Sequence, residues 1–454
     1  MQNLYRLPSE EELTDDKLNE FIARHAAECS FRYRQLQDAY ETEYPIFLEP
    51  AKPKWKPDNR IAVNFAKYIV DTMNGFFIGH PIKLQVDDDE AVKNYVELLD
   101  QYNDQDDNNA ELSKICSIFG KGYEMYYVDE ESNICITYLS PMDAFMIYDD
   151  SVLQRERYFV RLYVDADQVL HGSLSDEEKV RWFTIKGKLV WDEDEKLHGF
   201  DGVPATEYVE NKERMGVFEP VLTMINAYNK AISEKANDVD YFADAYLKIL
   251  GPQLEEDELN HVRDDRIINF DGDAEQVIVD FLQKPDGDTT QEHLIDRLEK
   301  LIFQISMVAN ISDENFGTSS GIAMKYKLQA MSNLEKTKER KFTSGMNRRY
   351  RLIFSNPVSG MKKDAWVKIH PHFTPNFPAN LQEEAEIARN IDGLVSQETQ
   401  LGVLSIVDNT TEEIKRMDDE KKESSGTSDL TRLFGLNNDG TGGDGDGTEN
   451  RTEE

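Results

Sequence analysis

The sequence predicts an α+β fold in which long helices flank a region of short antiparallel strands. Strand-like runs, separated by turns rich in Asp, Glu, Asn and Gly, follow one another from residue 123 to residue 191. Apolar residues recur at helical spacing elsewhere, most clearly over 220–242 and 321–354. With 39% hydrophobic and 10% aromatic residues, most of the 454-residue chain can bury a core. That length allows about two to four domains.

The N-terminal half is expected to begin with two helices and to continue as an antiparallel meander. The first helix is predicted over 10–40 and the second over 60–77, where Gly79 and Pro81 stop it. Short turns join the strands that follow, as in an antiparallel sheet. The predicted strands are 123–128, 134–139, 145–148, 158–164, 180–185 and 188–191.

Two long helices are predicted to bracket a small α/β insert in the second half. The first begins near Pro220, which suits an initial helical turn, and the second covers 290–311. This arrangement resembles a stalk that carries a head. The insert is predicted to contain strands at 246–250, 266–270 and 276–281 and a short acidic helix at 255–262.

A third long helix is predicted over 321–354 and would be roughly 50 Å long, at 1.5 Å per residue. Within 321–351 it carries nine basic residues against two acidic ones. These cations either pair with acidic neighbours, in the fold or in another subunit, or contact DNA. A strand at 366–370 and a helical region at 381–422 follow. Beyond residue 424 the composition is that of a disordered tail.

The composition excludes several classes of protein. The chain has 88 acidic and 51 basic residues, hence a net charge of −37, which repels free nucleic acid and acidic lipid. No stretch has the 18 or so uncharged apolar residues of a membrane span, and residues 1–12 lack a signal-peptide layout. The three cysteines lie far apart, which favours neither a disulfide framework nor a zinc site.

One motif is typical of hydrolases, but its context argues against catalysis. Residues 317–321 read Gly-Thr-Ser-Ser-Gly, and Asp364 and His370 follow in the order of a catalytic triad. A nucleophile elbow needs a preceding strand, whereas 294–308 has helical periodicity. Ser319 or Ser320 is instead expected to cap the following helix.

Other signals for catalysis or cofactors are weak. Gly120-Lys121-Gly122 lacks the spacing of a phosphate-binding loop, so no ATP hydrolysis is expected. His370 and His372 have no evident third metal ligand. We therefore expect no enzyme activity, no metal and no cofactor.

Three stretches, in this order, resemble portal proteins of tailed bacteriophages, the head-to-tail connectors of the siphophage type. They cover most of 10–422 together with the helices between them. The stretches are NRIAVNFAKYIV at 59–70 with GHPI at 79–82, FGTSSGIAMKYK at 316–327, and VSQET at 395–399 with 407–408 and 412–414.

The resemblance implies a portal fold with a β-containing wing, long stem and spine helices, a small α/β clip and a helical crown. The expected divisions are 1–215 wing, 216–244 and 289–311 stem helices, 245–288 clip, 312–320 tunnel loop, 321–378 spine helix and wing return, 379–424 crown, and 425–454 disordered acidic tail.

The resemblance also implies a function and partners. It implies a ring of about twelve copies at one capsid vertex, through which double-stranded DNA is packaged and ejected. The expected location is the virion, with the host cytoplasm during assembly and no membrane. The expected partners are the terminase large subunit, a head-completion or adaptor protein, and the major capsid and scaffolding proteins.

Three sets of residues are candidates for these roles. The tunnel loop would constrict the channel, basic residues of the long helix would contact DNA or a neighbouring subunit, and acidic clip residues would dock the motor. The sets are Asp313, Glu314, Asn315, Phe316, Gly317, Thr318, Ser319 and Ser320; Lys325, Lys327, Lys336, Lys338, Arg340 and Lys341; and Glu255, Glu256, Asp257 and Glu258.

Two other functions compete with this interpretation. One is an acidic, monomeric scaffold or binding protein, which would not form rings. The other is a serine hydrolase that uses Ser319.

Overall fold

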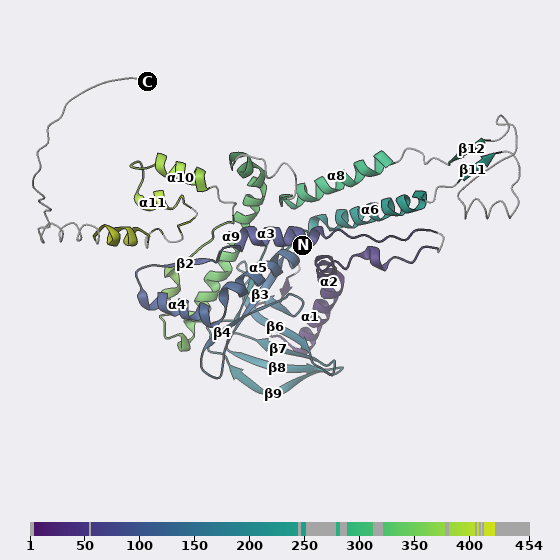
Figure 1. Ribbon diagram of the computed structural model, residues 1–454. Helices are drawn as coiled ribbons and strands as arrows, with labels where there is room; N and C mark the ends of the chain where they lie inside the picture. Colours follow the sequence, from purple (N-terminus) through teal and green to yellow (C-terminus); the bar gives the residue numbers. More distant parts are fainter. Residues whose placement is uncertain are drawn as a thin grey trace, which may run out of the picture. The chain divides into compact units, whose positions relative to one another are not determined.

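The computed structural model describes residues 4–53, 56–243, 247–250, 278–281, 288–311, 321–376 and 381–422, the last without 405, 408–409 and 411–412. The chain forms two compact units, Met1–Asn376 and Phe377–Glu454. Helices and sheets are both prominent in the first unit (Figure 1), so the α+β prediction is confirmed.

The first predicted helix is confirmed, with a distortion in its middle. Helix α1 (Asp15–Glu28) is capped by Thr14, whose side chain accepts a hydrogen bond from the Lys17 amide. A π-helical turn, η1 (Cys29–Tyr33), joins it to α2 (Arg34–Tyr40). Strand β1 (Tyr5–Arg6) precedes α1 and pairs in parallel with β5 (Ala144–Tyr148).

The second helix begins later than predicted. Helix α3 spans Phe65–Ile78, and the Asn64 side chain caps it by accepting from the Lys67 amide at 2.8 Å. Residues 60–63, which the pattern assigned to the helix, are not helical. The amides of Asn59, Ile61 and Val63 instead donate to side chains of α6 (Leu222–Ala243). Helices α4 (Glu90–Tyr102) and α5 (Gln105–Phe119) follow.

The predicted strands all form, but they divide between two sheets. The larger sheet has the order β1-β5-β6-β7-β8-β9 and holds four of the six predicted strands, and the smaller sheet has the order β10-β3-β4 and holds the other two. The strands are β3 (Lys121–Val128), β4 (Ile134–Leu139), β5 (Ala144–Tyr148), β6 (Glu156–Val164), β7 (Leu170–Ser175), β8 (Lys179–Ile185), β9 (Leu189–Leu197) and β10 (Ala205–Val209).

Two of these strands, β7 and β10, were not predicted. In β7 the sequence Leu-His-Gly-Ser-Leu-Ser lacks the β-branched and aromatic residues typical of strands. Gly172 belongs there for a steric reason, because a Cβ at this position would lie 2.3 Å from the ring of its cross-strand partner Phe183. The glycine thus makes room for a buried aromatic ring on β8.

The long helices after residue 216 form close to the predicted positions. A 3-10 turn, η3 (Glu219–Val221), leads into α6 (Leu222–Ala243), which runs beside α8 (Asp288–Ser306) away from the sheets (Figure 1). Two of the strands predicted for the insert form, β11 (Leu247–Leu250) and β12 (Ile278–Phe281). They pair antiparallel with each other. Helix α9 spans Gly321–Ser355.

The prediction of a strand at 366–370 is wrong for residues 366–368. Residues Ala365–Lys368 form the 3-10 turn η5, and β13 (Ile369–His372) follows and pairs with β2 (Lys83–Val86). Another 3-10 turn, η4 (Pro357–Ser359), separates α9 from this region. The second unit contains α10 (Leu381–Asn390), α11 (Gln397–Leu401) and a helix over 413–422.

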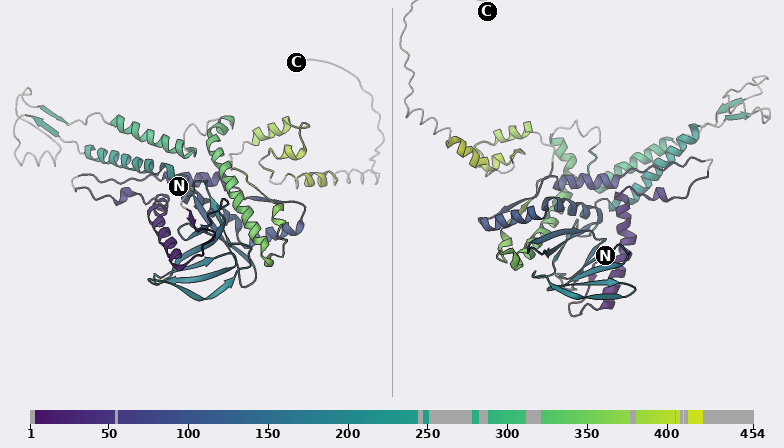
Figure 2. Two further views of the ribbon diagram at one scale, coloured as in Figure 1. Left: turned by 180° about the vertical axis from the view of Figure 1, so that it is seen from behind. Right: turned by 60° about the horizontal axis from the view of Figure 1, so that its bottom comes forward.

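The main core lies where α9 packs against α3, α5 and β10. Phe342 of α9 is buried, with its ring centroid 5.7 Å from that of Phe77 and 4.8 Å from that of Tyr208. A second core lies between α1 and the larger sheet, around Phe21 and Phe145. Figure 2 shows α9 from two further directions.

We predict that Gly120→Ala destabilises the protein strongly. Gly120 ends α5 with a φ of 84°, and a Cβ there would lie 2.1 Å from the carbonyl oxygen of Arg214. The left-handed conformation and the clash together should lower the free energy of unfolding by more than about 2 kcal/mol in denaturant titrations. Gly187→Ala is the control, because Gly187 has a φ of 76° but open space around it. Equal losses in the two variants would contradict the steric argument.

Candidate functional site

The structure describes only part of the predicted functional residues. The tunnel-loop set, 313–320, and the acidic clip set, 255–258, lie outside the described residues, as does the side chain of Lys325. Their roles therefore stay predictions. The remaining basic residues of α9 can be placed.

Helix α9 divides its basic residues between a buried and an exposed face. The side chain of Lys338 is only 1% exposed, and its ammonium lies 2.8 Å from Glu210 Oε2 and 2.5 Å from Ser117 Oγ. Lys327, Lys336 and Arg340 are exposed, and Lys341 is partly buried. Lys338 is therefore bound inside its own chain, where its buried ammonium does not face DNA or another subunit.

A second buried cation, Arg349, holds α9 against the smaller sheet. Its guanidinium forms an ion pair with Glu124 of β3, with Nε 2.9 Å from Oε2, and donates to Asn109 Oδ1 of α5 at 2.6 Å. Burial disfavours this charge, but the adjacent carboxylate outweighs burial and raises the pKa of Arg349. The guanidinium therefore stays charged, and its contacts join α9, β3 and α5.

The Glu124 carboxylate is further satisfied by two tyrosines. The hydroxyls of Tyr126 and Tyr208 each donate to Oε2 at 2.9 Å. Burial raises the pKa of both hydroxyls, so they remain donors. A buried charge pair with this many partners is costly to break from one side only.

Residues 59–63 form a ladder of hydrogen bonds with α6. The amides of Asn59, Ile61 and Val63 donate to Asn237 Oδ1, Ser233 Oγ and Asn229 Oδ1 at 2.6, 2.9 and 2.8 Å. All three acceptor side chains are buried.

The spacing of this ladder follows from elementary geometry. Two residues of extended chain rise about 6.6 Å, and four residues of helix rise about 6.0 Å, so alternate amides meet every fourth side chain of α6. Sequence reasoning missed these residues. The signal was present, because Asn229, Ser233 and Asn237 are polar residues at a spacing of four along the apolar pattern of α6.

Helix α3 packs against both α6 and α8. The Phe65 ring lies 4.9 Å from Tyr228 of α6 and 5.6 Å from Phe303 of α8, measured between centroids. The ring of Tyr68 also packs on Phe303, and its hydroxyl accepts from the Ile311 amide at 2.8 Å. The stretch 59–70 thus fixes α6, α8 and the residue immediately before 312–320.

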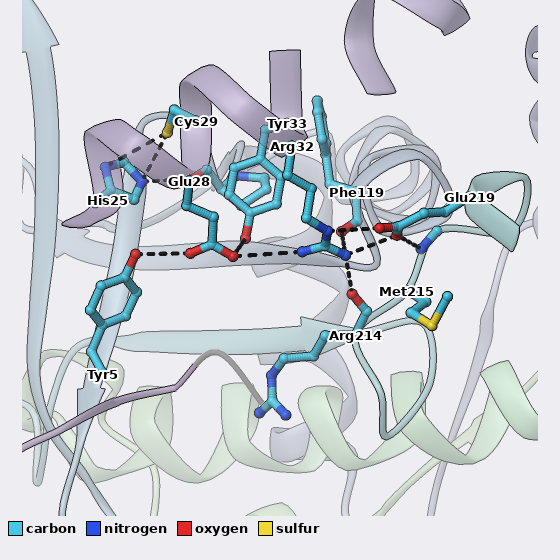
Figure 3. Close-up of polar contacts among 12 residues, drawn as sticks. Tyr5, His25, Glu28, Cys29, Arg32, Tyr33, Phe119, Arg214, Met215 and Glu219 are labelled. Atoms are coloured by element: carbon cyan, nitrogen blue, oxygen red, sulfur yellow. Dashed lines mark hydrogen bonds and ion pairs between the residues drawn. The ribbon is translucent and has the colours of Figure 1, made fainter. Parts of the chain in front are cut away.

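A polar network links the π-helical turn to the start of α6 (Figure 3). Arg32 binds the Glu219 carboxylate through Nε at 2.8 Å and a terminal nitrogen at 2.9 Å, and it donates to the Arg214 carbonyl at 2.6 Å. Burial works against the charge, but Glu219 raises the pKa of Arg32. Glu28, one turn earlier, accepts from the hydroxyls of Tyr5 and Tyr33, both at 3.0 Å. The network therefore joins the N-terminal strand and helices to the segment that enters α6.

A Cys–His contact beside this network is not poised for catalysis. Cys29 Sγ lies 3.5 Å from His25 Nε2 (Figure 3). Burial raises the pKa of the Cys29 thiol to about 12 and lowers that of His25, so both groups are neutral near pH 7. A neutral thiol is a poor nucleophile.

The two histidines of β13 bind different partners. His370 and His372 do not converge on a common site, because their Nε2 atoms bond to Asp87 and Gln85 respectively. Among the residues that the structure describes, no three His, Cys, Asp or Glu side chains gather as a metal site. None of the described helices is both long and apolar enough to cross a bilayer.

We predict that Arg349→Met lowers the free energy of unfolding by about 3–5 kcal/mol, because it leaves the Glu124 carboxylate buried without its cation. Lys363→Met is the control. Its ammonium pairs with Asp201, both side chains are more than 60% exposed, and loss of such a surface pair costs about 1 kcal/mol or less. Chemical denaturation of both variants checks this, and similar losses would contradict the importance of the buried pair.

Comparisons with known proteins point to one family. The family model described as phage portal protein, SPP1 Gp6-like, matches residues 19–427. The portal protein of Clostridium phage phiCD119 is 22% identical over 402 residues, which cover 82% of this chain and 86% of that protein. The match includes α3, the α6–α8 pair and α9 with their polar anchors. The chain therefore belongs to the SPP1 Gp6-like family of phage portal proteins.

Proposed function

We propose that this protein forms a ring of about twelve copies at one capsid vertex, through which double-stranded DNA is packaged and later ejected. The observation that carries the proposal is the family match over 19–427. It is supported by the way 59–70 holds the long helices together and anchors Ile311 next to the proposed tunnel loop.

We assign portal regions to the chain accordingly. Residues 1–215 and the return after α9 form the wing, α6 and α8 the stem, and α9 the spine. The clip is 245–288, the tunnel loop 312–320 and the crown 379–424. The antiparallel pairing of β11 and β12 between the two stem helices fits a protruding clip.

The net charge of −37 suits a channel that conducts DNA without holding it. Each phosphate neutralised by Lys or Arg adds affinity through counterion release, so an acidic wall lets the duplex slide. The basic residues Lys325, Lys327, Lys336, Arg340 and Lys341 contact either the passing duplex or a neighbouring subunit.

The partners follow from this location in the virion. Glu255, Glu256, Asp257 and Glu258 of the clip would dock the terminase large subunit, which supplies the energy of ATP hydrolysis. A head-completion or adaptor protein would replace the terminase large subunit. The major capsid and scaffolding proteins would surround the ring. Assembly would take place in the host cytoplasm.

The portal family is structural and not enzymatic, so the hydrolase hypothesis based on Ser319 is set aside. The family match over 19–427 favours the portal over the acidic scaffold, and the state of assembly tests the choice directly.

Electron microscopy of the purified full chain tests the ring. We expect class averages with about a dozen subunits around a hole of roughly 20 Å or more, wide enough for duplex DNA. Monomers at all protein concentrations, also when the scaffolding and capsid proteins are coexpressed, would favour the acidic scaffold.

Shortening the 312–320 loop tests the proposed channel constriction. We expect rings of unchanged size and a clear loss of packaged DNA, measured as nuclease-resistant DNA in filled heads. A matched deletion in the 425–454 tail is the control. Normal packaging with the shortened loop would contradict a role for 313–320 in the channel.

A further inference from the structure

Helix α8 carries more apolar surface than its contacts within the chain use. Ile295 and Ile302 are buried, whereas Leu294 and Ile305 are 51% and 41% exposed and Leu301 is partly buried. Large apolar side chains grouped on one exposed helix face are a feature of interaction surfaces.

The direction of these side chains follows from the helix period. At about 100° per residue, Leu294, Leu301 and Ile305 point within roughly 40° of one another and approximately opposite Phe303. Phe303 packs on Phe65 and Tyr68 of α3. The stripe of Leu294, Leu301 and Ile305 therefore faces away from α3 and lies on one flank of α8, about 16 Å long.

A second apolar surface lies on the other side of α6. The 3-10 turn η2 (Pro45–Leu48) packs on α6 and exposes Phe47 by 43% and Leu48 by 85%. Figures 1 and 2 show α6 between α8 and the segment that contains η2. The stripe and η2 thus belong to different sides of the α6–α8 pair.

A cavity of about 230 Å³ adjoins η2. It is lined by Tyr44, Pro45, Ile46, Glu49, Asn226, Ala227, Asn229 and Lys230. The Oδ1 atom of Asn226 and the Nδ2 atom of Asn229 are buried without a hydrogen-bond partner among the described residues. Such atoms are normally satisfied by protein or by ordered water, so these two add polar character to the cavity beside η2.

We propose that the α8 stripe of one copy docks on the η2 surface of the next copy in the ring. The inference rests on the proposed function, because a closed ring needs two different, complementary patches on each subunit. The chain offers such patches on the two sides of its stem pair. Arg297, three residues from Leu294 and four from Leu301, borders the stripe, and its charge complements the exposed Glu49 carboxylate, which lines the cavity beside η2.

Cross-linking between copies tests the docking. A full-length variant with Leu48→Cys and Leu301→Cys, treated with a short bismaleimide reagent, should give a ladder of covalent multimers up to the full ring on denaturing gels. The control pairs Leu48→Cys with Leu98→Cys, because Leu98 is 63% exposed on α4, away from the stem. This control should give no ladder beyond the background from the native Cys29, Cys116 and Cys135. That background is measured in variants that carry only one of the added cysteines.

A second experiment measures assembly directly. Leu294→Glu combined with Ile305→Glu should reduce the ring fraction at least tenfold by electron microscopy and sizing, with an unchanged thermal unfolding midpoint of the monomer. Leu98→Glu should leave rings intact. Two results would overturn this interface but leave the proposed function standing. In the first, the wild type forms rings but the Leu48→Cys, Leu301→Cys variant gives no ladder of cross-linked multimers. In the second, rings persist in the double glutamate variant. A wild-type chain that never forms rings would overturn both.

Discussion

The hydrogen-bond ladder between 59–63 and α6 is the constraint on which the long helices depend. Three buried polar side chains, Asn229, Ser233 and Asn237, accept the amides of an extended segment. A helix that presents these groups to an apolar neighbour would leave them unsatisfied, at a cost of about 1–3 kcal/mol each. The register between the segment and α6 is therefore fixed. The aromatic contacts of α3 with α6 and α8 follow directly from it.

Buried charge plays a similar part in the body of the first unit. Lys338 and Arg349 lie on the inner face of α9 and pair with Glu210 and Glu124 of the region around the smaller sheet. Arg32 and Glu219 make a comparable link between η1 and the approach to α6. Each pair fixes one geometry, because either partner alone would be a buried, uncompensated charge. The anchors of the long helices are consequently specific in direction, and apolar packing fills the space around them.

The helical periodicity of the sequence located α6, α8 and α9 to within a few residues, because their apolar stripes are long and regular. Short elements were harder. Strand β7 was missed because Gly172 and two serines give no strand signal, although Gly172 is needed for the Phe183 ring across the sheet. The π-helical turn at 29–33 was missed because its effect on spacing is a single residue.

The sequence by itself determined the α+β class, the long helices and, through three ordered motifs, the resemblance to portal proteins. Only the tertiary structure decided which parts of those motifs are helical and which cations are exposed. Residues 60–63 fit a helical pattern, but partners about 170 residues away hold them out of the helix. Lys338 and Lys336 are two positions apart, yet one is buried and one is not. Local pattern cannot make these distinctions, because the free energy that makes them comes from groups distant in sequence.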